Sequence, residues 1–330
     1  MMRKQLLAVA VSGAAALALA LQPGADAAPR QSQASGVAIK HLDASQAEHN
    51  RIVAYWTPKR MRNAIPADRL VAGRDKSSAT GRVAVGKPTK VSPQAKPGGG
   101  GAGLGEYYTG GGKVVTTTGK VFFTEKGLNY VCSGSSTTSA NKDVVLTAGH
   151  CVNEGPGAYV TNFAFVPAYD DGVRPYGTFT ARALLTTSQW AGSGDFNYDV
   201  GFAVVNPVNG TDLTDTVGSQ GIGFNQARGQ LMYSFGYPQA NPYDGSDIAW
   251  CYGNVIQDTF GGSTDQGLNC NMTGGSSGGP WFVGYNTGTG VGTLNSVNSF
   301  KYSGGKFRGY MWGPYFGSVI QSTYTTAAGL

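Results

Sequence analysis

The chain has 330 residues, of which 41% are hydrophobic and 13% charged; this composition supports a globular core and excludes a wholly disordered protein. The net charge of +6 is unevenly distributed: residues 1–100 hold 15 Lys or Arg and 5 Asp or Glu, whereas residues 101–330 hold 10 and 14. The later part is therefore mildly acidic, which removes the argument for nucleic-acid binding that a basic chain would give. The 51 glycines favour a turn-rich β protein over a helical one.

The N-terminus has the pattern of an export signal. Positive charge at Arg3 and Lys4 precedes an apolar, Ala-rich run at 6–21, and small residues follow at Ala25 and Ala27. The apolar run is nearly long enough for a membrane span, but the small residues and the lack of a later apolar run favour cleavage. We therefore expect a signal peptide over residues 1–27 and a secreted, extracellular protein without a stable membrane anchor.

Residues 28–112, called here the pre-segment, are basic and end in a linker-like stretch. Residues 28–83 are polar, with weak helical patterning at 44–56, and residues 83–112 are rich in Pro, Lys and Gly. The run at 96–101 has almost no side chains to pack and is typical of a flexible linker. We expect a propeptide here, although a tail that stays attached has the same composition.

From residue 113 onward, short apolar–polar alternations separated by turn residues predict an all-β domain that continues to residue 330. β-Branched and aromatic residues mark expected strands at 114–118, 120–124, 143–147, 201–205, 229–234, 280–283 and 291–297. Only the tail at 315–325 has a pattern that permits a short C-terminal helix. So many short strands predict a sandwich or a pair of barrels.

All four cysteines lie in the acidic part, and folding after secretion places them in an oxidising compartment. Three connectivities are possible; we expect the sequential pairs Cys132–Cys151 and Cys251–Cys270, each of which spans 19 residues. Closing such a loop stabilises a fold by about 3 kcal/mol in the chain-entropy model. A metal site is the alternative, but no CxxC spacing occurs and a single histidine accompanies the cysteines, so we expect no metal.

Amide hydrolysis by a serine needs a nucleophile, a base and donors for the oxyanion. Of the three histidines, His41 and His49 lie in the expected propeptide, which leaves His150 as the sole candidate for a histidine base. His150 follows an apolar strand and precedes Cys151, whose disulfide would hold the backbone that carries the imidazole. Because a lone histidine is more often structural, this interpretation depends on the two elements that follow.

The second element is the segment GGSSGGP at residues 274–280. Glycines on both sides of a serine allow backbone conformations in which amide groups converge on one point. In this interpretation Ser277 is the nucleophile, and the N–H groups of Gly275 and Ser277 form the oxyanion hole. A surface loop is the simple alternative; a phosphate-binding loop is disfavoured because its lysine is missing.

The third element is an acid that directly precedes the strand expected at 201–205. A carboxylate in such a place is easily buried, and its charge then orients and stabilises an imidazolium. Asp199 is the candidate, and Asp195 is an alternative acid four residues earlier. The simpler interpretation is an ordinary turn aspartate that caps a strand.

Together the three elements resemble a known family. TAGHC at 147–151, Asp199 before its strand and GGSSGGP are similar, in the same order, to the His, Asp and Ser motifs of the chymotrypsin-like serine peptidases, over residues 113–330. The pre-segment resembles that of secreted bacterial members, which include glutamyl endopeptidase-like enzymes. The resemblance implies two six-stranded antiparallel β-barrels with the active site between them, a catalytic triad of His150, Asp199 and Ser277, and no cofactor.

Two positions depart from the family's pattern. Ser276 stands where pancreatic members have an Asp that pairs with the new N-terminal amine, so we expect activation by removal of the pre-segment from the cleft. Asn271 stands at the substrate-binding position where trypsin-like members have an Asp, and no histidine follows His150 to select Glu. We therefore expect an uncharged substrate side chain in the primary pocket, unless Asp258 or Asp265 enters it.

The expected function is that of a secreted serine endopeptidase, a monomer that hydrolyses protein or peptide substrates through an acyl-enzyme. A catalytically silent binding protein on the same scaffold is the first alternative, but its signature, the loss of a triad residue, is not seen. A secreted esterase shares the chemistry, although the G-x-S-x-G elbow before a helix is missing. A carbohydrate-binding sandwich accounts for the 17 tyrosines but leaves the paired motifs unexplained.

Overall fold

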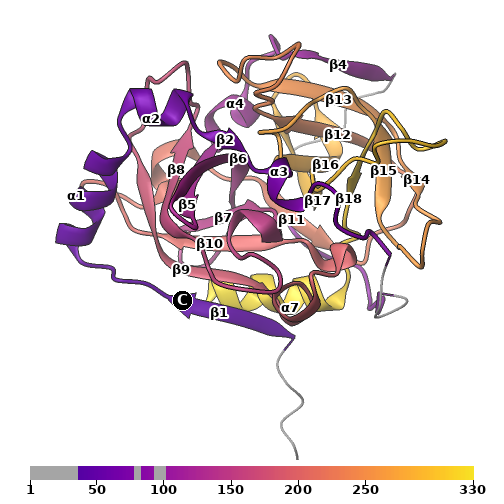
Figure 1. Ribbon diagram of the computed structural model, residues 1–330, viewed down its shortest axis with the longest axis horizontal. Helices are drawn as coiled ribbons and strands as arrows, with labels where there is room; N and C mark the ends of the chain where they lie inside the picture. Colours follow the sequence, from indigo (N-terminus) through magenta and orange to yellow (C-terminus); the bar gives the residue numbers. More distant parts are fainter. Residues whose placement is uncertain (1–35, 78–82, 93–101) are drawn as a thin grey trace, which may run out of the picture. The chain divides into compact units, whose positions relative to one another are not determined.

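The computed structural model describes residues 36–77, 83–92 and 102–330. The expected signal peptide at 1–27 and the glycine-rich run at 96–101 lie outside the described residues. In the described part, the strands form three sheets, and short helices connect or cover them (Figure 1).

The first sheet contains a closed six-stranded antiparallel barrel. Its strands pair in the order β9-β10-β7-β6-β5-β8, and β8 pairs back with β9. Two strands of the pre-segment extend this sheet, because β1 pairs with β9 and β2 pairs with β6. The bounds are β1 Val37–His41, β2 Ile65–Pro66, β5 Thr118–Glu125, β6 Leu128–Thr137, β7 Val144–Thr147, β8 Thr161–Pro167, β9 Phe179–Thr187 and β10 Gly201–Val205.

The second half of the chain forms a mixed sheet in the order β3-β11-β17-β16-β12-β13-β4, and a separate three-stranded sheet, β14-β15-β18. The pair β11–β17 is parallel and the others are antiparallel. The bounds are β3 Thr89–Val91, β4 Gly103–Tyr107, β11 Gly221–Phe224, β12 Leu231–Gly236, β13 Ala249–Asn254, β14 Ile256–Gln257, β15 Gln266–Asn269, β16 Pro280–Asn286, β17 Val291–Val297 and β18 Tyr310–Gly313.

This second sheet corrects part of the expected architecture. A second closed six-stranded antiparallel barrel was expected, whereas the described residues form an open, mixed sheet. Both of its edges are taken by strands of the pre-segment, β3 on β11 and β4 on β13, so the two edges do not pair with each other. The stretch 83–112, expected to be a linker, thus contributes two strands to the fold.

The helices are short, and one of them replaces an expected strand. Their bounds are α1 Gln46–Tyr55, α2 Pro58–Arg62, α3 Asp68–Val71, α4 Lys113–Thr117, α5 Ser188–Ser193, α6 Leu213–Val217 and α7 Ser318–Ala328, with 3₁₀ turns η1 Gly149–Cys151 and η2 Phe196–Tyr198. The helix α7 confirms the expected C-terminal helix. The strand expected at 114–118 is wrong, because α4 lies there. The hydroxyls of Thr116 and Thr117 donate to the carbonyl of Lys113, one turn back, and so support a helical turn despite their β propensity.

The pre-segment packs closely on the barrel. Ser45 caps α1 by accepting a hydrogen bond from the Glu48 backbone N–H, and α1 packs against β8 and β9. The Trp56 side chain is fully buried, and its indole N–H donates to the carbonyl of Asn162 on the barrel. Figure 1 shows this indigo segment running from α1 and α2, beside the barrel, to α3. The burial of a large aromatic side chain accounts for a firm attachment, since such burial stabilises by about 1.5–3 kcal/mol.

Candidate active site

His150 is presented at the end of β7 by the turn η1, and the Cys132–Cys151 disulfide ties this turn to β6. Its side chain is 1% exposed. Its Nδ1 lies 2.8 Å from Asp199 Oδ2, and its backbone N–H donates to Asp199 Oδ1 at 2.8 Å. Because both carboxylate oxygens accept from one residue, the ring position and the backbone of His150 are fixed together.

Asp199 is completely buried directly before β10. Burial alone raises the pKa of a carboxyl group, but the charge and hydrogen bonds of His150, with a hydrogen bond from Ser299, outweigh it and lower the pKa of Asp199. The Ser299 hydroxyl donates to Oδ2, the oxygen that also accepts from the imidazole. The carboxylate therefore stays ionised and orients the ring. The alternative acid, Asp195, instead caps η2 by accepting from the Asn197 N–H.

Ser277 lies in a tight loop between the second sheet and the barrel, and its side chain is 4% exposed. Gly275 has φ +97° and Gly278 φ +77°, and a Cβ atom at Gly278 would collide with Thr147 Oγ1. The Ser133 N–H donates to the Ser277 carbonyl at 2.7 Å, which joins the loop to β6. His150 Nε2 is buried and has no hydrogen-bond partner among the described residues, so no bond joins it to Ser277 in this conformation.

The amides expected to form the oxyanion hole differ from the neighbouring amides of the loop in their hydrogen bonding. In this loop, the N–H of Gly278 donates to the carbonyl of Asn298 and that of Gly279 to the carbonyl of Ser276. For the N–H groups of Gly275 and Ser277, the described residues offer no acceptor. These two donors therefore remain available for a ligand.

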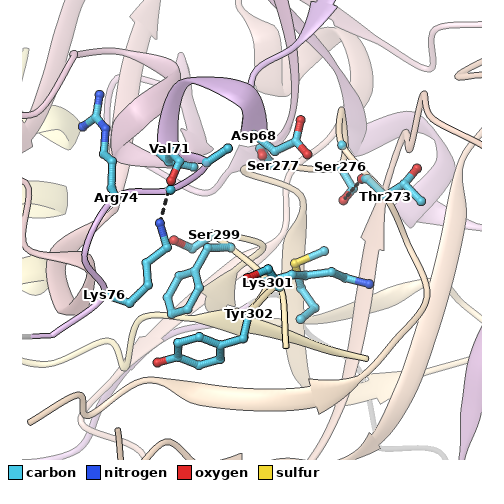
Figure 2. Close-up of a pocket in the computed structure, with 16 residues that line it drawn as sticks. Asp68, Val71, Arg74, Lys76, Thr273, Ser276, Ser277, Ser299, Lys301 and Tyr302 are labelled. Carbon is cyan, nitrogen blue, oxygen red and sulfur yellow. Dashed lines mark hydrogen bonds between the residues drawn. The ribbon is translucent and has the colours of Figure 1, made fainter. Parts of the chain in front are cut away.

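A cavity of about 370 Å³ opens beside Ser277 (Figure 2). The part of the chain after the pre-segment contributes residues from the loop before Ser277 and from the stretch after β17: Thr273, Ser276, Ser277, Ser299, Lys301 and Tyr302. The pre-segment contributes the opposite wall, with α3 and the residues that follow it: Asp68, Val71, Arg74 and Lys76. The proposed nucleophile thus lies in the same cavity as a part of the chain expected to be removed.

Comparison with known proteins shows close relatives among solved structures, although no protein-family model matches the chain. Protease Anisep from Arthrobacter nicotinovorans is 52% identical with a TM-score of 0.64, and the match covers 69% of this chain and 100% of that one. The thermostable serine protease AL20 from an extremophilic microorganism is 44% identical with a TM-score of 0.61, over 66% and 99% of the two chains.

Identity this high, over essentially the whole length of two proteases, decides the family. The chain is a chymotrypsin-like serine protease. A Glu endopeptidase shares the fold, with 17% identity and a TM-score of 0.52 over 68% of this chain and 97% of that one. An extracellular metalloprotease of Bacillus subtilis is 32% identical over 77 residues, or 23% of this chain. This chain spans about a quarter of that curated relative, 24% of its length.

Sequence reasoning missed several residues that hold the protease's site together. Asn298 is fully buried: its Nδ2 donates to the carbonyls of Ser276 and Phe235, and its Oδ1 accepts from Ser234 and Trp281. It therefore fixes the loop that carries Ser277. Asn298 and Ser299 belong to no motif that we recognised, and a polar pair after an apolar strand was the only available signal.

The expected substrate-binding residue, Asn271, lies outside the cavity wall. Its Oδ1 accepts from the Tyr243 hydroxyl at 2.6 Å and its Nδ2 donates to the carbonyl of Gly105. Asp258 and Asp265 are buried and do not line the cavity either. Asp258 accepts from the hydroxyl of Tyr302, which does line it. These contacts give Asn271 a part in holding β4 against the loop before Ser277.

The protease has two disulfides, Cys132–Cys151 and Cys251–Cys270, which are the sequential pairs. Atoms of Cys132, Cys151 and His150 lie within 4.8 Å of one another, a spacing that a metal site can have. The two sulfurs are bonded to each other, however, and a thiolate is the form of cysteine that binds metals. Ser276, next to Ser277, donates to the Thr273 carbonyl rather than forming an ion pair. Among the described helices, none is long and apolar enough to cross a bilayer.

Proposed function

We propose that this serine protease is a secreted endopeptidase in which Ser277 is the nucleophile, His150 the base and Asp199 the orienting acid. The observation that carries the proposal is the buried His150–Asp199 pair, whose Nδ1–Oδ2 distance is 2.8 Å while Nε2 keeps no partner. A base needs one ring nitrogen held by the acid and the other free to take a proton. The sequence motifs and the two close relatives support the same assignment.

The reaction follows from these groups. Ser277 Oγ attacks the carbonyl carbon of the scissile bond and gives its proton to His150 Nε2. The carbonyl oxygen becomes an oxyanion that accepts hydrogen bonds from the N–H groups of Gly275 and Ser277. The C–N bond breaks as His150 returns the proton to the leaving amine, and an acyl-enzyme remains on Ser277. Water then attacks the ester with the same proton transfers in reverse order.

We also propose that the chain is exported through a signal peptide at 1–27 and held inactive by the pre-segment until that is removed. The Asp68 carboxyl packs against Gly274, beside the nucleophile loop, and burial raises its pKa. Arg74 donates to the carbonyls of Glu154 and Gly155, which fastens the next turn to the barrel side of the cleft. The match with Anisep covers 69% of this chain and the whole of that solved chain. Substrate and pre-segment therefore compete for one cavity.

A fluorophosphonate probe tests both parts, because it reacts only with an activated serine. We expect the processed, secreted protein to be labelled on Ser277 and the Ser277→Ala variant to stay unlabelled. Ser276→Ala is the matched control and keeps the reaction. We expect the precursor, separated by mass, to react at least tenfold more slowly.

The two parts can fail separately. An unlabelled, folded, processed sample would contradict the assignment of the nucleophile and favour a silent binding protein on this scaffold. Equal labelling rates for precursor and processed protein would leave the nucleophile in place and refute inhibition by the pre-segment.

A further inference from the structure

The cavity beside Ser277 has an uneven distribution of charge. The described residues that line it from outside the pre-segment are uncharged, with Lys301 as the one exception. They include Thr273 and Ser276 from the loop before Ser277, and Phe300, Tyr302 and Met311 from the last part of the chain. Once the pre-segment leaves, a single cation therefore remains in the wall of the pocket next to the nucleophile.

Lys301 is half-buried and poorly compensated. Its Nζ donates to the carbonyl of Cys270 at 2.6 Å, which uses one of the three donors of an ammonium group. No ion pair joins it to an acid within the described residues. Burial lowers the pKa of Lys301 to about 8, as expected for an ammonium group that has lost water without gaining a counter-charge. A carboxylate that entered the pocket would supply that charge.

None of the nearby acids in the described part of the chain supplies a counter-charge to Lys301. Asp258 accepts from the Tyr302 hydroxyl and from the Phe260 N–H. Asp265 is fully buried and its oxygens have no partner, but it does not line the cavity. Asp68 of the pre-segment does line the cavity, yet the charges that act on it are those of His150 and Arg69. Once the pre-segment has left, the described lining therefore offers a substrate a positive group and no negative one.

We infer that Lys301 makes the protease prefer substrates with Glu or Asp immediately before the scissile bond. The inference rests on Ser277 being the nucleophile: its Oγ must reach the carbonyl carbon, so the side chain of that same substrate residue lies nearest to the pocket. In the view of Figure 2, the Lys301 chain extends below Thr273 and Ser276. The substrate carboxylate accepts a charge-assisted hydrogen bond from Nζ. This replaces the sequence-based expectation of an uncharged side chain.

The test compares peptides that differ only in the residue before the cleaved bond: Glu, Gln, Asp, Asn, Arg and Phe. Active-site titration with the fluorophosphonate normalises every rate. For the processed wild type we expect kcat/KM for Glu to exceed that for Gln by about ten- to a hundredfold, the range of a hydrogen bond to a charged group. Lys301→Gln brings the ratio close to one, because kcat/KM for Glu falls much more than kcat/KM for Gln. Lys301→Glu shifts the preference towards Arg.

Lys306→Gln is the matched control, because Lys306 is exposed and lies outside the cavity; it keeps the wild-type ratio. A wild type that titrates fully but cleaves Gln as fast as Glu overturns the inference and leaves the catalytic assignment intact. So does a Lys301→Gln variant that keeps the preference. If a Lys301 variant fails to titrate because it does not fold, the wild-type ratio alone decides. An untitratable wild type refutes the nucleophile assignment, on which the inference depends.

Discussion

In the barrel, the buried charge at the site is Asp199, and the chain itself satisfies it with two hydrogen bonds from His150 and one from Ser299. In the second half, the charge at the site is Lys301, which has one carbonyl as partner. The loop beside it is neutral, and the described part of the chain offers no acceptor to the amides of Gly275 and Ser277. The first half is thus complete before substrate arrives, whereas the second half is completed by the substrate. In our proposals the first half holds the base and its acid, whereas the second half holds the nucleophile, the oxyanion donors and the group that sets selectivity.

The largest effect on activity is expected for Ser277, the proposed nucleophile. Ser277→Ala should lower kcat for peptide hydrolysis by about a million-fold, as for loss of the nucleophile in related chemistry. Its neighbour Ser276, which only donates to the Thr273 carbonyl, is the control, and Ser276→Ala should keep most of the activity. Steady-state hydrolysis of one peptide by both variants makes the measurement. If the two serines exchanged these outcomes, the nucleophile would be misassigned.

The second-largest effect on kcat is expected for Asp199, the buried charge that is hydrogen-bonded by His150 and Ser299. Asp199→Asn should lower kcat by about 10⁴-fold, because a neutral amide no longer selects the ring tautomer or stabilises the imidazolium. Asp195→Asn removes the alternative acid and should change kcat by less than about threefold, with a small loss of stability from the weakened cap. Both variants should be compared at one pH with the same peptide. A stronger effect at Asp195 would transfer the acid's role to it.

The preference for Glu over Gln should depend on pH, because it depends on the charge of Lys301. Burial lowers the pKa of Lys301 to about 8, and a lysine is charged below its pKa. The ratio of kcat/KM for Glu and Gln peptides should therefore be greatest below pH 8, at about ten- to a hundredfold, and fall towards one as pH rises through 8. A Glu-to-Gln ratio that stayed constant up to pH 10 would show that the charge of Lys301 does not determine the preference for Glu.

The smallest effect is expected at the third partner of Asp199. The pKa of Asp199 is lowered from 3.8, so the group contributes stability above that pH and loses it as pH falls through its folded value. Ser299→Ala removes a bond that lowers this pKa, so acid unfolding should begin at a higher pH, and kcat should fall only several-fold. Ser296→Ala, which loses a buried bond to the Pro314 carbonyl, is the control and should not move the acid transition. Tryptophan fluorescence during acid titration measures it.

The sequence marks the residues of the proposed triad more clearly than the residues that support them. His150, Asp199 and Ser277 lie in motifs whose backbone is set by local glycines and by a neighbouring cysteine, so nearby residues reveal them. Lys301 and Asn298 act through contacts with segments distant in sequence, such as Cys270 and Ser234, and nothing beside them marks that role.

The same limit explains the errors in the fold. Threonines at 116 and 117 have high β propensity, yet their hydroxyls bond to the backbone one turn back and favour α4. The strands β3 and β4 contain Gly or Lys, and their composition predicts a linker. They are strands because they pair with β11 and β13. Propensity describes a residue alone, whereas these elements depend on the partner that they meet.

Those two edge strands also bear on how the protein behaves at high concentration. An open sheet edge displays unpaired N–H and C=O groups that recruit strands of other molecules and promote aggregation. β3 and β4 cover both ends of the mixed sheet, so the edges of β11 and β13 are not displayed while they remain in place. A form cut between β3 and β4 uncovers the edge of β11, and a form cut downstream of β4 uncovers both edges. The position of the cut therefore sets the colloidal stability of the released enzyme as well as its access to substrate.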